Sequence, residues 1–392
     1  MILLLSCTNT QWAPDAVLPL LALPGCNAVS VVEGAFVPQG SELTASPEPC
    51  TAPFHATAGA RDSTLLIESD AELRIEDLAG GSLSNPVVLQ RSGEVLVHVD
   101  ATDTYWLSVT CLEGCEAEYT RYPVVLMHGM GGSDAFGGVP YFFRVEETLE
   151  ELGFEIQAPP VTPFATAAQR APEWEVHLEL LRAEGVGRKF NLLGHSQGGL
   201  DARYLVGGLG RADLVASITT VGSPHQGTRT ADLIYGVVED GTVDAAWVDV
   251  GAEVFAALFG LEGDDNSLVE AMEGLTTEAM AEFNETVPDD PEIPLWSWAG
   301  GTCGALEFDC QQARDGEIVD PLLAPTWLIL WLDGQDSDGM VPIDSATWGT
   351  FLGELNADHA DLAGIFEDEA TDAFDHLAFY TDETRRLHAQ GL

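Results

Sequence analysis

Apolar and polar positions alternate with a period near two from about residue 61 to residue 120. Because successive side chains of a strand point to opposite faces, this alternation is typical of half-buried strands. Turn residues separate its four stretches: 63–68, 72–76, 94–99 and 105–110. We predict a small all-β, sandwich-like domain over residues 61–118. Residues 8–60 are rich in Pro, Ala, Thr and Gly and are predicted to be an irregular lead-in or linker.

From Tyr122 onward, short apolar runs alternate with amphipathic stretches. Strands are predicted at 123–127, 154–157, 190–193 and 214–221, and helices near 140–152, 168–184 and 197–209. Strands that alternate with helices form parallel βαβ units with helices on both faces of the sheet. The sequence therefore predicts an α/β fold for residues 119–392.

Composition and charge restrict the possible partners. Hydrophobic residues make up 46% of the chain, yet no uninterrupted apolar run reaches the roughly 18–20 residues of a membrane-spanning helix. Lys and Arg number 15 against 64 Asp and Glu, which gives a formal net charge of −49. Such a surface repels phosphate backbones, so we expect no nucleic-acid partner.

A candidate nucleophile lies in the pentapeptide Gly194-His195-Ser196-Gln197-Gly198. The pentapeptide follows a predicted strand and precedes a predicted helix, which is the context that a Gly-x-Ser-x-Gly nucleophile elbow requires. Its glycines permit a strained turn that holds the serine hydroxyl clear of the sheet. We predict that Ser196 is the catalytic nucleophile rather than part of a structural Gly-rich turn.

Oxyanion donors are predicted at two backbone positions. Gln197 directly follows the serine, and the loop 128–132, His-Gly-Met-Gly-Gly, follows the first strand of the α/β region. In this arrangement the N–H groups of Gln197 and Met130 bind the oxygen of a tetrahedral intermediate. A phosphate-binding loop does not fit, because no Gly-Lys-Ser/Thr follows and the surrounding charge is acidic.

The acid and the base of such a triad follow the serine in the order Asp or Glu, then His. Asp338, in an Asp-Gly turn followed by apolar residues, is the preferred acid, and His359 is the preferred base. His225 precedes every candidate acid, and His376 is the alternative base. The carboxylate would fix the tautomer of the imidazole and stabilise the imidazolium.

These motifs, in this order, resemble the proteobacterial true lipases, which are secreted triacylglycerol hydrolases of the α/β-hydrolase fold. The resemblance begins near Tyr119 and rests on these segments: 123–134, 138–141, 191–199, 220–227, 230–232, 275–276, 283–284 and 296–298. It implies an α/β-hydrolase with a mostly parallel sheet and a helical lid. The β-rich N-terminal region has no counterpart in that family.

The resemblance also implies one structural calcium ion. The family's two aspartates correspond to Asp320 and Asp361, and its two main-chain carbonyl ligands correspond to Ile365 and Glu369. Carboxylates and carbonyls are the oxygen ligands that Ca²⁺ prefers, and an ion there would hold the loop that carries His359. The alternative is that the two aspartates are further surface acids in an acidic chain.

An amphipathic stretch within residues 232–284 is predicted to be a lid. Apolar positions recur there at helical spacing with carboxylates between them: Val248, Val250, Val254, Phe255, Leu258 and Phe259. A mobile lid would bury this face when closed and present it to a lipid surface when open. The alternative is a cap that packs permanently on the core.

Residues 1–7 resemble a truncated lipoprotein signal, because the apolar run ends in Leu-Leu-Ser-Cys as a bacterial lipobox does. An acylated Cys7 would attach the protein to a membrane. The six other cysteines allow several pairings, of which the neighbouring ones are predicted: Cys26–Cys50, Cys111–Cys115 and Cys303–Cys310. Both features favour an extracytoplasmic location, secreted or in the cell envelope.

The sequence therefore predicts a serine ester hydrolase, and more specifically a triacylglycerol lipase that meets its lipid ester at an interface. One alternative is a carboxylesterase or polyester depolymerase with the same triad. An alternative from another functional class is a non-catalytic surface binding protein on a hydrolase scaffold. Whether folding needs a helper protein is not decided by the sequence.

Overall fold

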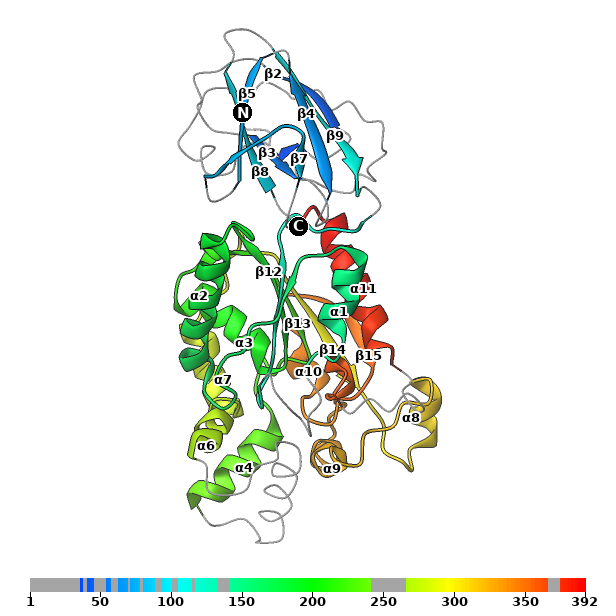
Figure 1. The fold of residues 1–392 in the computed structure, drawn as a ribbon. Coiled ribbons are helices and arrows are strands. Elements are labelled where there is room, and N and C mark those ends of the chain that lie inside the picture. Colours follow the sequence, from blue (N-terminus) through cyan, green and yellow to red (C-terminus); the bar gives the residue numbers. More distant parts are fainter. Residues whose placement is uncertain are drawn as a thin grey trace, which may run out of the picture. The chain divides into compact units, whose positions relative to one another are not determined.

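The computed structural model describes twelve stretches of the chain: 36–37, 41–45, 54–57, 63–69, 71–77, 80–88, 94–100, 105–114, 117–132, 141–240, 266–365 and 374–392. The chain divides into two compact units, Met1–Arg121 and Tyr122–Leu392. Figure 1 shows the ribbon of both units, and each is described by itself below.

The first unit contains two β-sheets. Four strands form where the alternation predicts them: β4 (Thr64–Ser69), β5 (Glu72–Glu76), β8 (Glu94–Asp100) and β9 (Tyr105–Glu113). Two short strands, β6 (Ser82–Leu83) and β7 (Val87–Val88), lie between them. The sheets have the orders β1-β3-β8-β5-β6 and β2-β9-β4-β7. Leu65, Ile67, Val95 and Val97 are buried, as alternate positions of these strands should be.

Residues 8–60 were predicted to be an irregular lead-in, but three strands of these sheets form within them. They are β1 (Phe36–Val37), β2 (Ser41–Ala45) and β3 (Phe54–Thr57). β2 pairs with β9 and β3 pairs with β8, both antiparallel. β1 and β3 are too short to show a clear alternation, and β2 contains only one large apolar residue, Leu43. Their pairing with strands far along the chain defines them.

The second unit is built on a six-stranded sheet in which every pairing is parallel. Its order is β11-β10-β12-β13-β14-β15. The strands are β10 (Val124–Met127), β11 (Ile156–Gln157), β12 (Phe190–His195), β13 (Val215–Val221), β14 (Leu295–Gly301) and β15 (Thr350–Asn356). Every residue of β10, β12 and β13 is buried, as expected when helices cover both faces of a sheet. The predicted α/β fold is confirmed.

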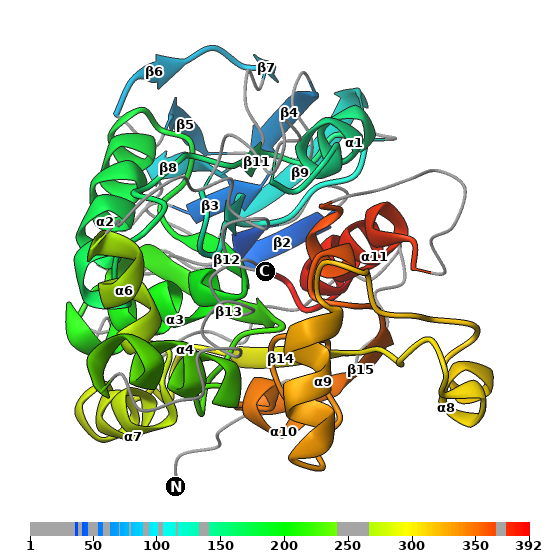
Figure 2. The same cartoon turned by 90° about the horizontal axis from the view of Figure 1, so that it is seen from below.

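Helices cover both faces of this sheet. α1 (Val145–Leu152) and α11 (His376–Ala389) contribute to one apolar cluster, and α2 (Ala167–Ala183) to another on the opposite face. α3 (Gln197–Arg203) lies beside α2 and continues into a π-helical turn, Tyr204–Gly208. Figure 2 shows the strands between these two layers. The helices predicted near 140–152, 168–184 and 197–209 are confirmed.

The remaining helices gather toward one end of the sheet (Figure 1). They are α4 (Arg229–Asp240), α6 (Asn266–Glu273), α7 (Thr277–Thr286), α8 (Phe308–Ala313), α9 (Ala324–Leu332) and α10 (Ile343–Ala346). Two short 3-10 turns also form, Ala212–Leu214 just before β13 and Asp361–Ala363 after β15. The apolar residues on which the lid prediction rests fall in 241–265, outside the described residues. Among the described helices, none is both long and apolar enough to cross a membrane.

Candidate active site

Ser196 occupies a sharp turn between β12 and α3. Its backbone angles are φ 54° and ψ −128°, a conformation that a non-glycine residue adopts only at a cost. A Cβ on Gly198 would lie 2.1 Å from the carbonyl oxygen of Met127, and one on Gly194 would lie 2.5 Å from the nitrogen of Gly199. The glycines of the pentapeptide are therefore required by close backbone packing, which holds the serine at the N-terminus of α3.

The three predicted triad side chains meet at the end of the sheet that follows β12 and β15. His359 Nε2 lies 2.9 Å from Ser196 Oγ, and His359 Nδ1 lies 2.7 Å from Asp338 Oδ2. All three side chains are buried. The backbone N–H of His359 also donates to the carbonyl oxygen of Asp338 at 2.8 Å, so the two loops are tied together. His359 can therefore take the proton of Ser196 while Asp338 stabilises the resulting imidazolium.

The alternative base lies elsewhere. His376, at the start of α11, places Nε2 at 2.8 Å from the carbonyl oxygen of Phe143. The triad contacts are therefore made by His359.

A second histidine packs directly on the base. The rings of His195 and His359 have centroids 4.7 Å apart, and Tyr141 Oη lies 2.5 Å from His195 Nδ1. Burial, with a smaller contribution from the charge of His359, holds the pKa of His195 well below its usual value. His195 is therefore a neutral ring that supports His359 without competing for its proton.

The two predicted oxyanion donors lie in different loops, one directly after Ser196 and one after β10. Gln197 begins α3, and Met130 follows β10 in a loop that is buried. Among the residues that the structure describes, neither backbone N–H has a hydrogen-bond acceptor. Both groups are therefore free to bind a developing oxyanion.

Arg170 of α2 holds this loop, and the sequence analysis did not single it out. Its guanidinium donates to the carbonyl oxygens of His128 and Gly129 and to Oε1 of Gln197, at 3.1 Å for the last. Its Nε forms an ion pair with Asp201 Oδ2 at 2.9 Å, and both side chains are fully buried. The sequence did contain a signal for Arg170. It lies four residues before Trp174 and therefore on the same, buried face of the helix, where an arginine is unusual.

Asp201 has a second hydrogen-bond partner beside Arg170. Burial raises the pKa of Asp201 to about 6, although Arg170 opposes this shift. Trp174 Nε1 donates to the same carboxylate oxygen at 3.0 Å. The arginine is thereby fixed in the orientation that holds both loop carbonyls.

Arg170→Lys is expected to lower kcat on a soluble short-chain ester by about 10²-fold, with a smaller effect on KM. Lysine keeps the positive charge beside Asp201, but a single ammonium cannot contact two carbonyls and Gln197 together. The matched control is Arg182→Lys on the same helix, which pairs with exposed Glu179 and Asp213. An unchanged kcat in a folded Arg170→Lys protein would contradict the role of Arg170.

Of the predicted calcium ligands that the structure describes, Asp361 lies in a cluster of acidic side chains and Asp320 lies next to that cluster. Asp361 belongs to a group with Glu317 and Asp358 whose carboxylate oxygens lie within 4.8 Å of one another. Asp320 is adjacent, because its backbone N–H donates to Asp358 Oδ2 at 2.8 Å, but it is outside that group. Ile365 is buried, and Glu369 lies outside the described residues. Glu317 and Asp358 were missed, although Asp358 directly precedes the base.

A serine nucleophile, its imidazole base and a buried aspartate at one edge of a parallel sheet define a serine ester hydrolase of the α/β-hydrolase fold. The protein named triacylglycerol lipase from Vibrio cholerae serotype O1 is 30% identical over 286 residues, which cover 70% of this chain and 89% of that relative. The chain belongs to the triacylglycerol lipase family.

The chain is also similar to a second relative, a family model and a solved structure. The triacylglycerol lipase of Pseudomonas fragi is 27% identical over 70% of this chain and 98% of its own length. A family model described as palmitoyl protein thioesterase matches residues 123–259. The crystal structure of the metagenomic carboxyl esterase MGS0156 covers 69% of this chain and 76% of its own, with 16% identity and a TM-score of 0.51, a similarity of fold.

Proposed function

We propose that this protein is a lipase that hydrolyses the ester bonds of acylglycerols. The observation that carries the proposal is the hydrogen-bonded Ser196–His359–Asp338 geometry, in a chain related over most of its length to proteins named triacylglycerol lipase.

The proposed reaction has two halves. Ser196 Oγ attacks the ester carbonyl while His359 Nε2 takes its proton, and the N–H groups of Met130 and Gln197 bind the oxyanion. The alcohol departs with the proton that His359 returns, and the acyl group stays bound to Ser196. Water, deprotonated by His359, then attacks the acyl-enzyme, and the fatty acid and free serine are released.

The test is an acyl-length profile measured on emulsified triacylglycerols and on soluble short-chain esters. We expect rates on long-chain emulsions that exceed those on the soluble esters. Activity confined to short soluble esters would favour a carboxylesterase and overturn the lipase proposal, as would activity confined to polyesters.

We also propose a structural Ca²⁺ held by Asp361 together with Glu317 and Asp358. The donor set fits, because three carboxylates converge and Ca²⁺ takes six to eight oxygen ligands. Burial, with Asp320 as a further cause, raises the pKa of Asp358 to about 6. A cation would offset the repulsion between these carboxylates and so hold the loop that carries His359.

Calcium is therefore expected to stabilise the protein. At about 100 times its Kd, a ligand that binds only the folded state contributes about 2.7 kcal/mol. This should raise Tm by about 5–10 °C. Asp361→Asn should remove the Tm increase, whereas Asp382→Asn, on the exposed side of α11, should keep it. Equal Tm values with Ca²⁺ and with a chelator would refute the site.

We propose an extracytoplasmic location as well. The Cys303–Cys310 disulfide, one of the three predicted pairs, supports it, because such bonds persist in oxidising compartments. The other predicted pairs and Cys7 involve positions outside the described side chains. Acylation of Cys7 predicts that Cys7→Ser moves the protein from the membrane fraction to the soluble fraction, and an unchanged distribution would reject it.

A further inference from the structure

Helix α9 carries an exposed apolar face. Its nine residues, Ala-Pro-Thr-Trp-Leu-Ile-Leu-Trp-Leu, include no charged side chain, in a protein where 20% of residues are charged. Its inner face is anchored, because Thr326 and Leu330 are buried. On the outer face Leu328, Trp331 and Leu332 are 38%, 47% and 64% exposed. Residues three and four apart share a helix face, so these three side chains lie together.

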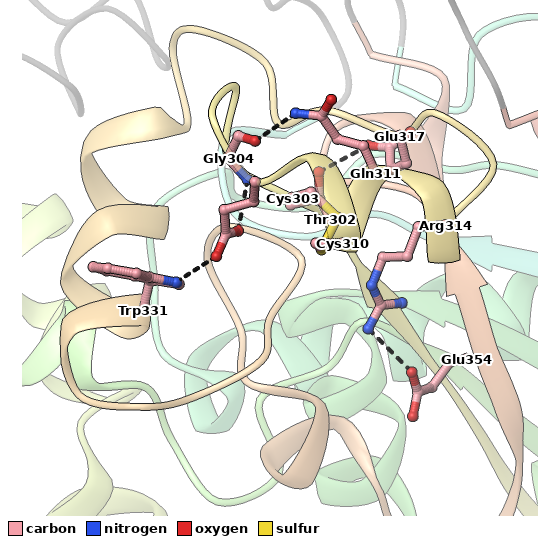
Figure 3. Close-up of a disulfide and its surroundings, with 10 residues drawn as sticks. Thr302, Cys303, Gly304, Cys310, Gln311, Arg314, Glu317, Trp331 and Glu354 are labelled. Carbon is pink, nitrogen blue, oxygen red and sulfur yellow. Dashed lines mark hydrogen bonds and ion pairs between the residues drawn. A yellow bond between two sulfur atoms is a disulfide. The ribbon is translucent and has the colours of Figure 1, made fainter.

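The segment before α8 is fastened to this face. Trp331 Nε1 donates to Glu307 Oε1 at 2.6 Å, and the other oxygen of Glu307 accepts the N–H of Gly304 at 3.1 Å. The Cys303–Cys310 disulfide closes the loop that contains Gly304 and Glu307 (Figure 3). Two large apolar side chains flank Glu307, namely Leu306 and Phe308, which are 86% and 72% exposed.

We call these residues the α8–α9 apolar surface: Leu306, Phe308, Leu328, Trp331 and Leu332. Trp331 resembles tryptophans at membrane interfaces, because its indole N–H is satisfied by a carboxylate while much of its ring remains in contact with water. The Trp331–Glu307 hydrogen bond joins the two parts of this surface. Soluble proteins rarely expose large apolar patches that have no partner.

Helix α9 is connected to the end of the sheet that carries the catalytic residues. α9 packs against α4 at the same end of the sheet (Figures 1 and 2). The chain that leaves α9 leads directly to Asp338, and Gly339 packs on the side chains of Val319 and Leu323, just before α9. Helix α9 is therefore close, both along the chain and in packing, to the turn that carries the catalytic acid.

We propose that the α8–α9 apolar surface docks this protein on the surface of an uncharged lipid phase. The proposal rests on the proposed function, because a lipase must meet an insoluble substrate. The net charge of −49 repels anionic lipid surfaces, so we expect the protein to bind an uncharged lipid surface more strongly. Apolar burial supplies the attraction, and the surface brings the Asp338 loop toward the lipid.

The test measures partition onto trioleoylglycerol droplets coated with phosphatidylcholine, with Ser196→Ala in every protein so that the droplets stay intact. Leu328→Ser combined with Leu332→Ser should lower the partition coefficient by at least about tenfold. Both leucines are exposed, so the variant should fold. The matched control is Leu180→Ser, an exposed leucine of α2, which should bind like the parent protein. Droplets coated with phosphatidylglycerol should bind the parent protein more weakly.

Active enzymes with the same substitutions separate this proposal from the proposed function. The double variant should lose activity on the droplets in proportion to its partition and keep its activity on a soluble acetate ester. Unchanged partition, or an equal loss in Leu180→Ser, would overturn the docking surface. So would a dimer of the parent protein, in sedimentation without lipid, that the double variant fails to form. A parent enzyme without activity on any ester would instead refute the proposed function.

Discussion

Ser196→Ala is expected to lower kcat on an ester substrate by about 10⁶-fold. Alanine removes the hydroxyl that lies 2.9 Å from His359 Nε2, so no acyl-enzyme forms. The oxyanion donors still bind the substrate, and their contribution accounts for the small residual rate above that of water. Initial rates on a soluble ester measure the loss, and covalent labelling by a fluorophosphonate probe should disappear in parallel.

The matched control is Ser223→Ala. Ser223 is also buried, and its Oγ has no hydrogen-bond partner among the described residues, so loss of its hydroxyl should leave the rate unchanged. Equal labelling of the parent protein and Ser196→Ala would contradict the assignment of the nucleophile. Absence of labelling in the parent protein would favour the non-catalytic binding alternative.

Asp338→Asn is expected to lower kcat by about 10⁴-fold. The two carboxylate oxygens face donors on both sides: Oδ2 contacts His359 Nδ1, and Oδ1 accepts the N–H groups of Met340 and Val341. An asparagine amide has only one oxygen, so it cannot accept from both sides. If the amide NH₂ faces His359, the asparagine favours the wrong tautomer of the imidazole. If the NH₂ faces the N–H groups of Met340 and Val341, three donors meet with no acceptor between them.

Asp333→Asn, an exposed aspartate just after α9, is the matched control and should keep full activity. The measurement is kcat from substrate saturation on a soluble ester, with thermal unfolding to show that both variants are folded. A loss of less than about tenfold in Asp338→Asn would indicate that another carboxylate supports His359.

Several parts of this protein depend on local patterns and could be predicted from the amino-acid chain. The elbow at Ser196 was predictable because a buried strand, a glycine-flanked serine and a helix are adjacent in the chain, and backbone sterics alone require that turn. The parallel sheet followed from alternating strand and helix periods. The order of serine, aspartate and histidine, read against this fold, identified the three side chains that the structure brings together.

Other features depend on contacts between distant segments and could be seen only in the folded chain. Arg170 supports the oxyanion loop through contacts to residues 27 to 42 positions away, and no local pattern encodes them. The convergence of Glu317 with Asp358 and Asp361 likewise needed the fold. The sequence of α9 is almost entirely apolar, so it does not tell which face of the helix has a partner. Solvent exposure is a property of the packed molecule, so only the structure showed that part of this face is left uncovered.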